Sequence, residues 1–176
     1  MNRSWLMIAA ALAAVPMPAG AELSASEPAG FAAQGKVLIA APPPAVWDGL
    51  TEPRRFWDGE HTYSGDSTNL SLDPVPGGCF CETVPANGGA IEHARVIYAT
   101  PGEVLRLRGS LGPLQSEALV GTLTVTLKPV DGGTELEWVY VVGGYARFSL
   151  EQVAPVVDSV VGTQFERLAD ALGRLD

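Results

Sequence analysis

Apolar and polar residues alternate along most of the stretch from 69 to 142, a pattern that indicates strands with one buried face. No helical pattern in this stretch is long enough to connect parallel strands, so the strands are expected to pair antiparallel. The turn-forming pairs Asn-Gly at 87–88, Pro-Gly at 101–102 and Asp-Gly at 131–132 separate the alternating segments. The sequence therefore predicts an antiparallel meander.

Helical periodicity follows the meander. Apolar residues recur at three- and four-residue steps between Val157 and Leu172, and Pro155 is of a type common at the first position of a helix. We expect a helix from about Pro155 to Leu172, long enough to cover the apolar face of several strands.

The segment before the meander predicts a strand and two short helices. The strand-like run Lys-Val-Leu-Ile-Ala at 36–40 ends in a proline run, after which Val46, Trp47 and Leu50 share one helical face. A second apolar patch follows at 56–57.

The three turns also predict which residues face inward. If each pair forms a tight turn, Val96 pairs with Leu107, Tyr98 with Leu105, and Glu82 opposes His93 on the outer face. A bulge would reverse the faces beyond it. The residues predicted to face inward include Cys79, Cys81, Val96, Tyr98, Leu107, Trp138 and Tyr140.

The N-terminus has the pattern of a signal peptide. Arg3 precedes an apolar run, and Ala-Gly-Ala at 19–21 fits the small-residue cleavage site. Pro16 and Pro18 end the run before it could span a membrane. Residues 1–21 are therefore predicted to be cleaved, and the mature protein to be periplasmic or secreted with no integral membrane segment.

The chain suits a single domain, because its 176 residues are enough for one substantial core. Residues 22–30 are small and polar and are predicted to be a flexible N-terminal segment. The folded domain is predicted over 31–174.

The order of these segments resembles the START-like, helix-grip (SRPBCC) superfamily, which includes polyketide cyclases, lipid-transport proteins and homologues of the Hsp90 ATPase activator. The resemblance is carried by Ala-Val-Trp-Asp at 45–48, Phe-Trp at 56–57, Pro-Gly-Gly-Cys-Phe at 76–80, Gly-Gly-Thr-Glu-Leu at 132–136 and the terminal helix. It implies an α+β fold in which a curved antiparallel sheet of six to seven strands surrounds a long C-terminal helix, with two short helices after the first strand.

The resemblance also implies a cavity between sheet and helix that holds a small apolar or amphipathic ligand. An exported binding protein is the expected function. The alternatives are an enzyme of the polyketide cyclase or hydrolase type and an exported protein-interaction module. No catalytic set is shared across the superfamily, so none is assigned. The residues expected to contact the ligand are Trp57, Cys79, Cys81, Tyr98, Leu107, Trp138, Tyr140, Val157 and Val161.

The net charge and the absence of known motifs argue against several classes of function. The formal net charge is −9, and no cluster of Lys or Arg could neutralise a phosphate backbone, so nucleic acid is not an expected partner. No nucleotide-binding or standard hydrolase motif occurs, and no cofactor is expected. His61 and Tyr63 lie in a polar segment that could supply an acid or base at the mouth of a cavity, or could simply be solvated.

The two cysteines are predicted to be free thiols in the core. Residues two apart on a strand have Cα atoms about 6.5 to 7 Å apart, at or beyond the comfortable limit for a disulfide. A metal site is not expected, because His93 is predicted on the opposite face and His61 lies in a distant loop.

Overall fold

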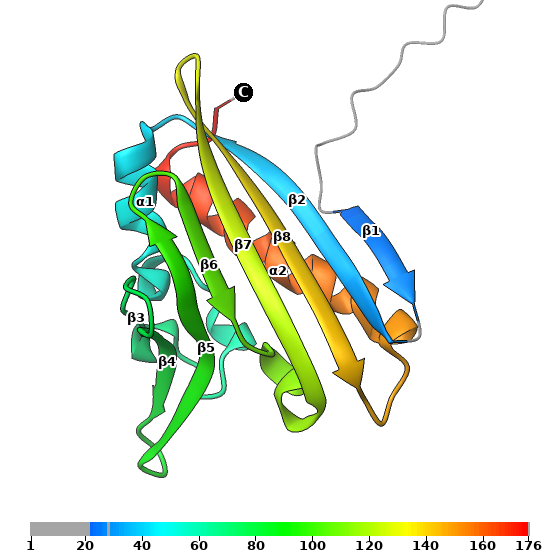
Figure 1. Cartoon of the computed structure of the whole chain (residues 1–176). Helices are drawn as coiled ribbons and strands as arrows, with labels where there is room; N and C mark the ends of the chain where they lie inside the picture. Colours follow the sequence, from blue (N-terminus) through cyan, green and yellow to red (C-terminus); the bar gives the residue numbers. More distant parts are fainter. Residues whose placement is uncertain (1–21, 28, 176) are drawn as a thin grey trace, which may run out of the picture.

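The computed structural model describes residues 22–27 and 29–175, in which one antiparallel sheet packs against a long C-terminal helix (Figure 1). The predicted signal peptide, residues 1–21, lies outside the described residues, so export stays a prediction. None of the described helices is long and apolar enough to cross a membrane. The predicted α+β helix-grip architecture is confirmed.

The sheet has the strand order β1-β2-β8-β7-β6-β5-β4-β3, and all neighbours pair antiparallel. The short edge strands β1 and β3 bring the described sheet to eight strands. The strands are β1 Glu22–Glu27, β2 Gly30–Ile39, β3 Leu70–Leu72, β4 Cys79–Val84, β5 Gly89–Thr100, β6 Val104–Arg108, β7 Ala118–Val130 and β8 Gly133–Tyr145.

Strand β1 differs from the sequence prediction, which makes residues 22–30 a flexible segment. Its backbone pairs with β2 from Glu22 opposite Gln34 to Glu27 opposite Gly30. An edge strand needs only backbone hydrogen bonds on one side, so small polar residues can form one without an apolar signature. The folded part of the chain therefore begins before the predicted boundary.

The terminal helix α2 spans Leu150–Leu172 and starts earlier than predicted. The hydroxyl of Ser149 accepts a hydrogen bond from the backbone N–H of Gln152 at 3.4 Å and caps the helix. Pro155, which the sequence places at the helix start, lies inside the helix instead. The serine cap, and not the proline, marks the N-terminus.

The connection between β2 and β3 begins with the predicted helix α1, Pro43–Leu50, which buries Val46, Trp47 and Leu50. Short 3-10 helices follow α1, so the predicted second short helix is present in 3-10 form. These are η1 Pro53–Arg55, η2 Gly59–His61 and η3 Ser67–Asn69, and a fourth, η4 Gly112–Ser116, connects β6 to β7.

The β7–β8 hairpin has the predicted register. Leu127 pairs with Leu136 and Val125 with Trp138 around the tight turn at Asp131-Gly132. Gly132 has a φ of 81°, the left-handed conformation that this turn requires of its second residue. The inward positions of Trp138 and Tyr140, both almost fully buried, are therefore confirmed.

The β4–β5 hairpin does not have the predicted register. Its turn covers four residues, so that Val84 pairs with Gly89, and β5 bulges at His93. The wider turn shifts the pairing by two residues and keeps the faces, but the one-residue bulge reverses β4 relative to the inward residues Ala94 and Val96. Phe80 and Glu82 are therefore buried, whereas Cys79 and Cys81 are only partly buried on the other side. The predicted inward orientation of the two cysteines is wrong.

A second bulge reverses the end of β5. Val96 pairs with Leu107 as predicted, but Tyr98 pairs with Arg106 because Ile97 is an extra residue in the strand. Tyr98 is 47% exposed, and the Arg106 guanidinium lies over its ring, 5.5 Å from the centroid. The predicted inward orientation of Tyr98 is therefore wrong.

The middle of the sheet and α2 enclose a packed core. Trp138 stacks on Phe165 of α2 with ring centroids 5.6 Å apart. The buried hydroxyl of Tyr140 donates to the backbone O of Gly109 and accepts from the N–H of Leu111, each at 3.0 Å. Burial raises the pKa of Tyr140 to about 12, so its hydroxyl stays protonated.

Candidate functional site

A pocket of about 500 Å³ opens beside the N-terminal half of α2. The loop around η2, the strands β4 and β5, and the start of η4 form its other walls. Its lining residues are Trp57, Glu60, His61, Thr62, Tyr63, Phe80, His93, Leu111, Gly112, Pro113, Val153, Val156, Val157, Val160 and Val161.

Helix α2 gives the pocket an aliphatic wall. Its five lining valines fall at helical spacing, so they share one side of the helix. Val157 and Val161 are buried, whereas Val156 is 62% exposed at the edge. Trp57 and Phe80, with ring centroids 5.2 Å apart, extend the apolar surface onto the loop and the sheet.

The buried side chain of Gln164 fastens the η2 loop to α2. Its Oε1 accepts a hydrogen bond from the Asp58 backbone N–H at 2.8 Å. Its Nε2 donates to the Val160 backbone O at 2.8 Å and lies 3.0 Å from Nδ1 of His61. Because the amide nitrogen is a donor, His61 Nδ1 is the acceptor.

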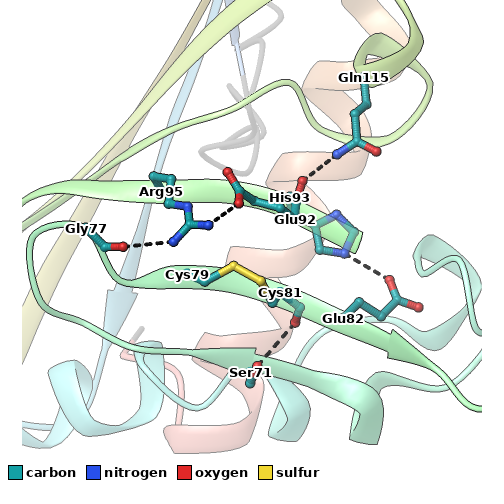
Figure 2. The surroundings of a disulfide bond; sticks show 9 residues. All are labelled: Ser71, Gly77, Cys79, Cys81, Glu82, Glu92, His93, Arg95 and Gln115. Atoms are coloured by element: carbon teal, nitrogen blue, oxygen red, sulfur yellow. Dashed lines mark hydrogen bonds and ion pairs between the residues drawn. A yellow bond between two sulfur atoms is a disulfide. The ribbon is translucent and has the colours of Figure 1, made fainter. Parts of the chain in front are cut away.

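The carboxylate of Glu82 fastens the other end of the same loop to the sheet. This residue is only 1% exposed, yet it accepts hydrogen bonds from the backbone N–H groups of Tyr63, at 3.1 Å, and Ser64. A third bond joins its Oε2 to Nε2 of His93 at 2.9 Å (Figure 2). Glu82 and His93 do pair across the strands, but they are buried and not on the surface as predicted, because of the altered β4–β5 register.

The protonation states of this pair follow from their surroundings. Burial acts to raise the pKa of Glu82, but the hydrogen bonds from Ser64, Tyr63 and His93 outweigh it and hold that pKa below its usual value. Burial lowers the pKa of His93, against the opposing effect of the neighbouring Glu82 carboxylate. At neutral pH the pair is therefore an ionised carboxylate and a neutral imidazole.

Aromatic rings hold the His93 imidazole in the pocket wall. Its centroid lies 5.0 Å from that of Phe80 and 5.9 Å from that of Tyr63. The Tyr63 hydroxyl donates to the backbone O of Gly112 at 2.9 Å and so connects the η2 loop to η4. His61, Tyr63 and His93, together with Glu60 and Thr62, thus bring groups capable of hydrogen bonding to a mainly apolar cavity.

The structure separates the nine residues expected to contact a ligand into three groups. Trp57, Val157 and Val161 lie in the pocket wall. Leu107, Trp138 and Tyr140 are packed in the core. The remaining three, which face away from the pocket, are Cys79, Cys81 and Tyr98.

Cys79 and Cys81 form a disulfide, which contradicts the prediction of free thiols (Figure 2). Their Cα atoms are 5.4 Å apart, within the usual disulfide range and closer than a regular strand allows. The pairing of β4 is irregular at this point because His93 bulges opposite it. The described residues contain no cluster of three or more side chains suited to a metal ion.

Sequence reasoning missed that Glu82 and His93 belong to the site. The available signal was the alternation in β4, where apolar Phe80 and acidic Glu82 must share a face. Pro85 also sits at the start of the observed four-residue turn.

A long helix held against an antiparallel sheet, with a pocket beside the helix, defines a helix-grip protein, and solved structures share this fold. Mll3558 from Rhizobium loti aligns with a TM-score of 0.60 at 20% identity, over 81% of this chain and 97% of that chain. MLL2253 from Mesorhizobium loti gives 0.56 at 22% identity, over 82% and 98%. CalU16 from Micromonospora echinospora gives 0.51 at 16% identity, over 80% and 73%.

At these identities the likeness establishes the fold alone. No family model matches the chain, and no curated protein matches it.

Proposed function

We propose that this protein is a distant member of the START-like superfamily that binds a small apolar or amphipathic molecule beside α2. The observation that carries this proposal is the pocket itself. Its volume of about 500 Å³ suits a small organic molecule, and its walls are mainly valine and aromatic side chains. A bound ligand would cover exposed apolar surface such as Val156.

Filling the pocket tests this function. Val160→Trp would place an indole in the cavity from a half-buried position on α2. The affinity for a neutral fluorescent probe such as N-phenyl-1-naphthylamine should fall at least about tenfold, because the probe and the indole compete for the same space. Val141→Trp, at a 51% exposed position on β8, is the matched control and should leave probe affinity unchanged.

Equal probe affinity in a folded Val160→Trp protein would refute binding at this site. Thermal melts of the three proteins check that each is folded. Failure of the wild-type protein to bind any neutral apolar probe would refute the function as a whole.

A cyclase-type enzyme is the second candidate, and one observation favours it. A neutral imidazole held by a buried carboxylate at the wall of an apolar pocket is an arrangement suited to general-base chemistry. We test it with 5-nitrobenzisoxazole, a neutral compound whose ring opens when a base removes its carbon-bound proton. Turnover by the wild type that is no faster than turnover by His93→Gln would exclude this role for His93.

We also propose that the mature protein acts outside the cytoplasm. The N-terminal signal pattern supports export, and so does the Cys79–Cys81 disulfide, because disulfides persist mainly in oxidising compartments. N-terminal sequencing of protein from the periplasmic fraction should begin at or near Glu22. A full-length chain retained in the cytoplasm would refute the proposal.

A further inference from the structure

One ring nitrogen of His93 has no hydrogen-bond partner among the described residues. Nε2 faces the Glu82 carboxylate at 2.9 Å, and an ionised carboxylate can only accept a hydrogen bond. The proton of the neutral imidazole is therefore on Nε2. The other ring nitrogen, Nδ1, carries a lone pair and is a hydrogen-bond acceptor.

This acceptor is available to a ligand. Nδ1 lies on the side of the ring away from Glu82 (Figure 2), and the contacts described for His93 leave it without a hydrogen bond from any described residue. Among the described side chains, Oδ1 of Asp158 is the one polar atom that is both fully shielded from solvent and without a hydrogen bond. Since Nδ1 of His93 also has no hydrogen bond there, it is not fully shielded from solvent. Since His93 lines the pocket, a molecule bound there can reach Nδ1.

The charges around the pocket restrict the kind of group that can reach this nitrogen. The lining contains Glu60 but no lysine or arginine, and the buried Glu82 carboxylate lies directly behind His93. A carboxylate or phosphate group would therefore meet negative charge and find no cation to pair with. An ammonium group would lose its hydration against a valine wall, and the Glu82 carboxylate is already occupied by three donors.

We propose that the ligand is a neutral molecule with a hydroxyl or phenol group, and that this O–H donates to Nδ1 of His93 and thereby orients the molecule in the pocket. This inference rests on the proposed binding function and specifies its ligand class. Glu82 acts as a positioning residue, because its carboxylate keeps the proton on Nε2.

Four naphthalenes of similar size test the inference on the mature wild-type protein at neutral pH. 2-Naphthol can donate a hydrogen bond, 2-methoxynaphthalene cannot, 2-naphthoate is an anion and 2-naphthylmethylamine is a cation. By titration calorimetry, 2-naphthol should bind about three- to tenfold more tightly than 2-methoxynaphthalene, which corresponds to one net hydrogen bond. The two charged compounds should bind more weakly than 2-naphthol.

Long-range ¹H–¹⁵N NMR of the histidine ring gives a second readout that needs no variant. The His93 Nδ1 signal should move towards that of a hydrogen-bonded nitrogen when 2-naphthol is added, and should not do so with 2-methoxynaphthalene. In His93→Phe the affinity ratio of the two probes should fall to about one, because the acceptor is gone. Gln115→Ala, which removes a hydrogen bond to the β5 backbone next to His93 but lies outside the pocket, should keep the wild-type ratio.

The outcomes separate the two proposals. Equal affinity for 2-naphthol and 2-methoxynaphthalene with an unmoved Nδ1 signal would overturn the hydroxyl inference and leave the binding function standing. Tighter binding of either charged compound would also overturn it. If none of the four compounds binds, the proposed binding function itself fails.

Discussion

Replacing Glu82 by alanine should destabilise the protein far more than a typical surface mutation. The substitution leaves three donors without their acceptor: the backbone N–H groups of Tyr63 and Ser64, and Nε2 of His93. An unsatisfied buried donor costs about 1–3 kcal/mol. Because two of the donors are only partly buried, we expect a total loss of about 3–5 kcal/mol, a large share of a typical domain's stability.

Urea unfolding at neutral pH measures this loss. Glu92→Ala is the matched control, since Glu92 is an exposed acid on β5 whose ion pair with Arg95 lies at the surface. Its cost should stay within about 0.5 kcal/mol. A loss below about 1 kcal/mol for Glu82→Ala, with unchanged binding of a pocket probe, would refute the conclusion that this carboxylate holds the η2 loop to the sheet.

Three further predictions address other parts of the structure. Alkylation of the denatured, unreduced protein should label neither Cys79 nor Cys81, and reduction should expose both to labelling; labelling before reduction would contradict the disulfide. The urea midpoint should fall as the pH drops from neutral through 6.5, the ordinary pKa of histidine, and on below 4.5, that of glutamate. Folding lowers the pKa of both His93 and Glu82, so the unfolded chain binds more protons in acid, and a midpoint that rises in acid would contradict this sign. Tyr140→Phe removes two backbone hydrogen bonds and should cost about 1–3 kcal/mol in thermal unfolding, whereas no measurable loss would show that neither bond contributes.

The sequence predicts the fold well wherever a short-range signal sets the backbone. The tight turn at Asp131-Gly132 fixes the β7–β8 register, so the alternation along β8 correctly places Trp138 and Tyr140 inside. The prediction fails where β5 bulges at His93 and Ile97. Each bulge adds one residue and reverses the faces beyond it, and neither has a distinctive local sequence.

The position of the pocket could not be predicted from the sequence for a different reason. A cavity was expected around Trp138, but that space is filled by packing. A Cβ added to Gly35 would lie 2.8 Å from Nε1 of Trp138, so the glycine leaves room for the indole, which also stacks on Phe165. Such complementarity joins residues far apart in the chain, and no pattern along a single sequence reveals it.

The proline inside α2 has a consequence for how quickly a ligand could exchange. Pro155 has no N–H, so the carbonyl of Glu151 lacks the helical hydrogen bond that it would otherwise accept. The helix turn before Pro155 carries Val153, which lines the pocket, whereas the opposite wall is fastened through Gln164 and Glu82. Local opening needs least free energy where hydrogen bonds are fewest, so we expect the first turn of α2 to open more readily than the opposite wall and to limit how long a bound molecule stays.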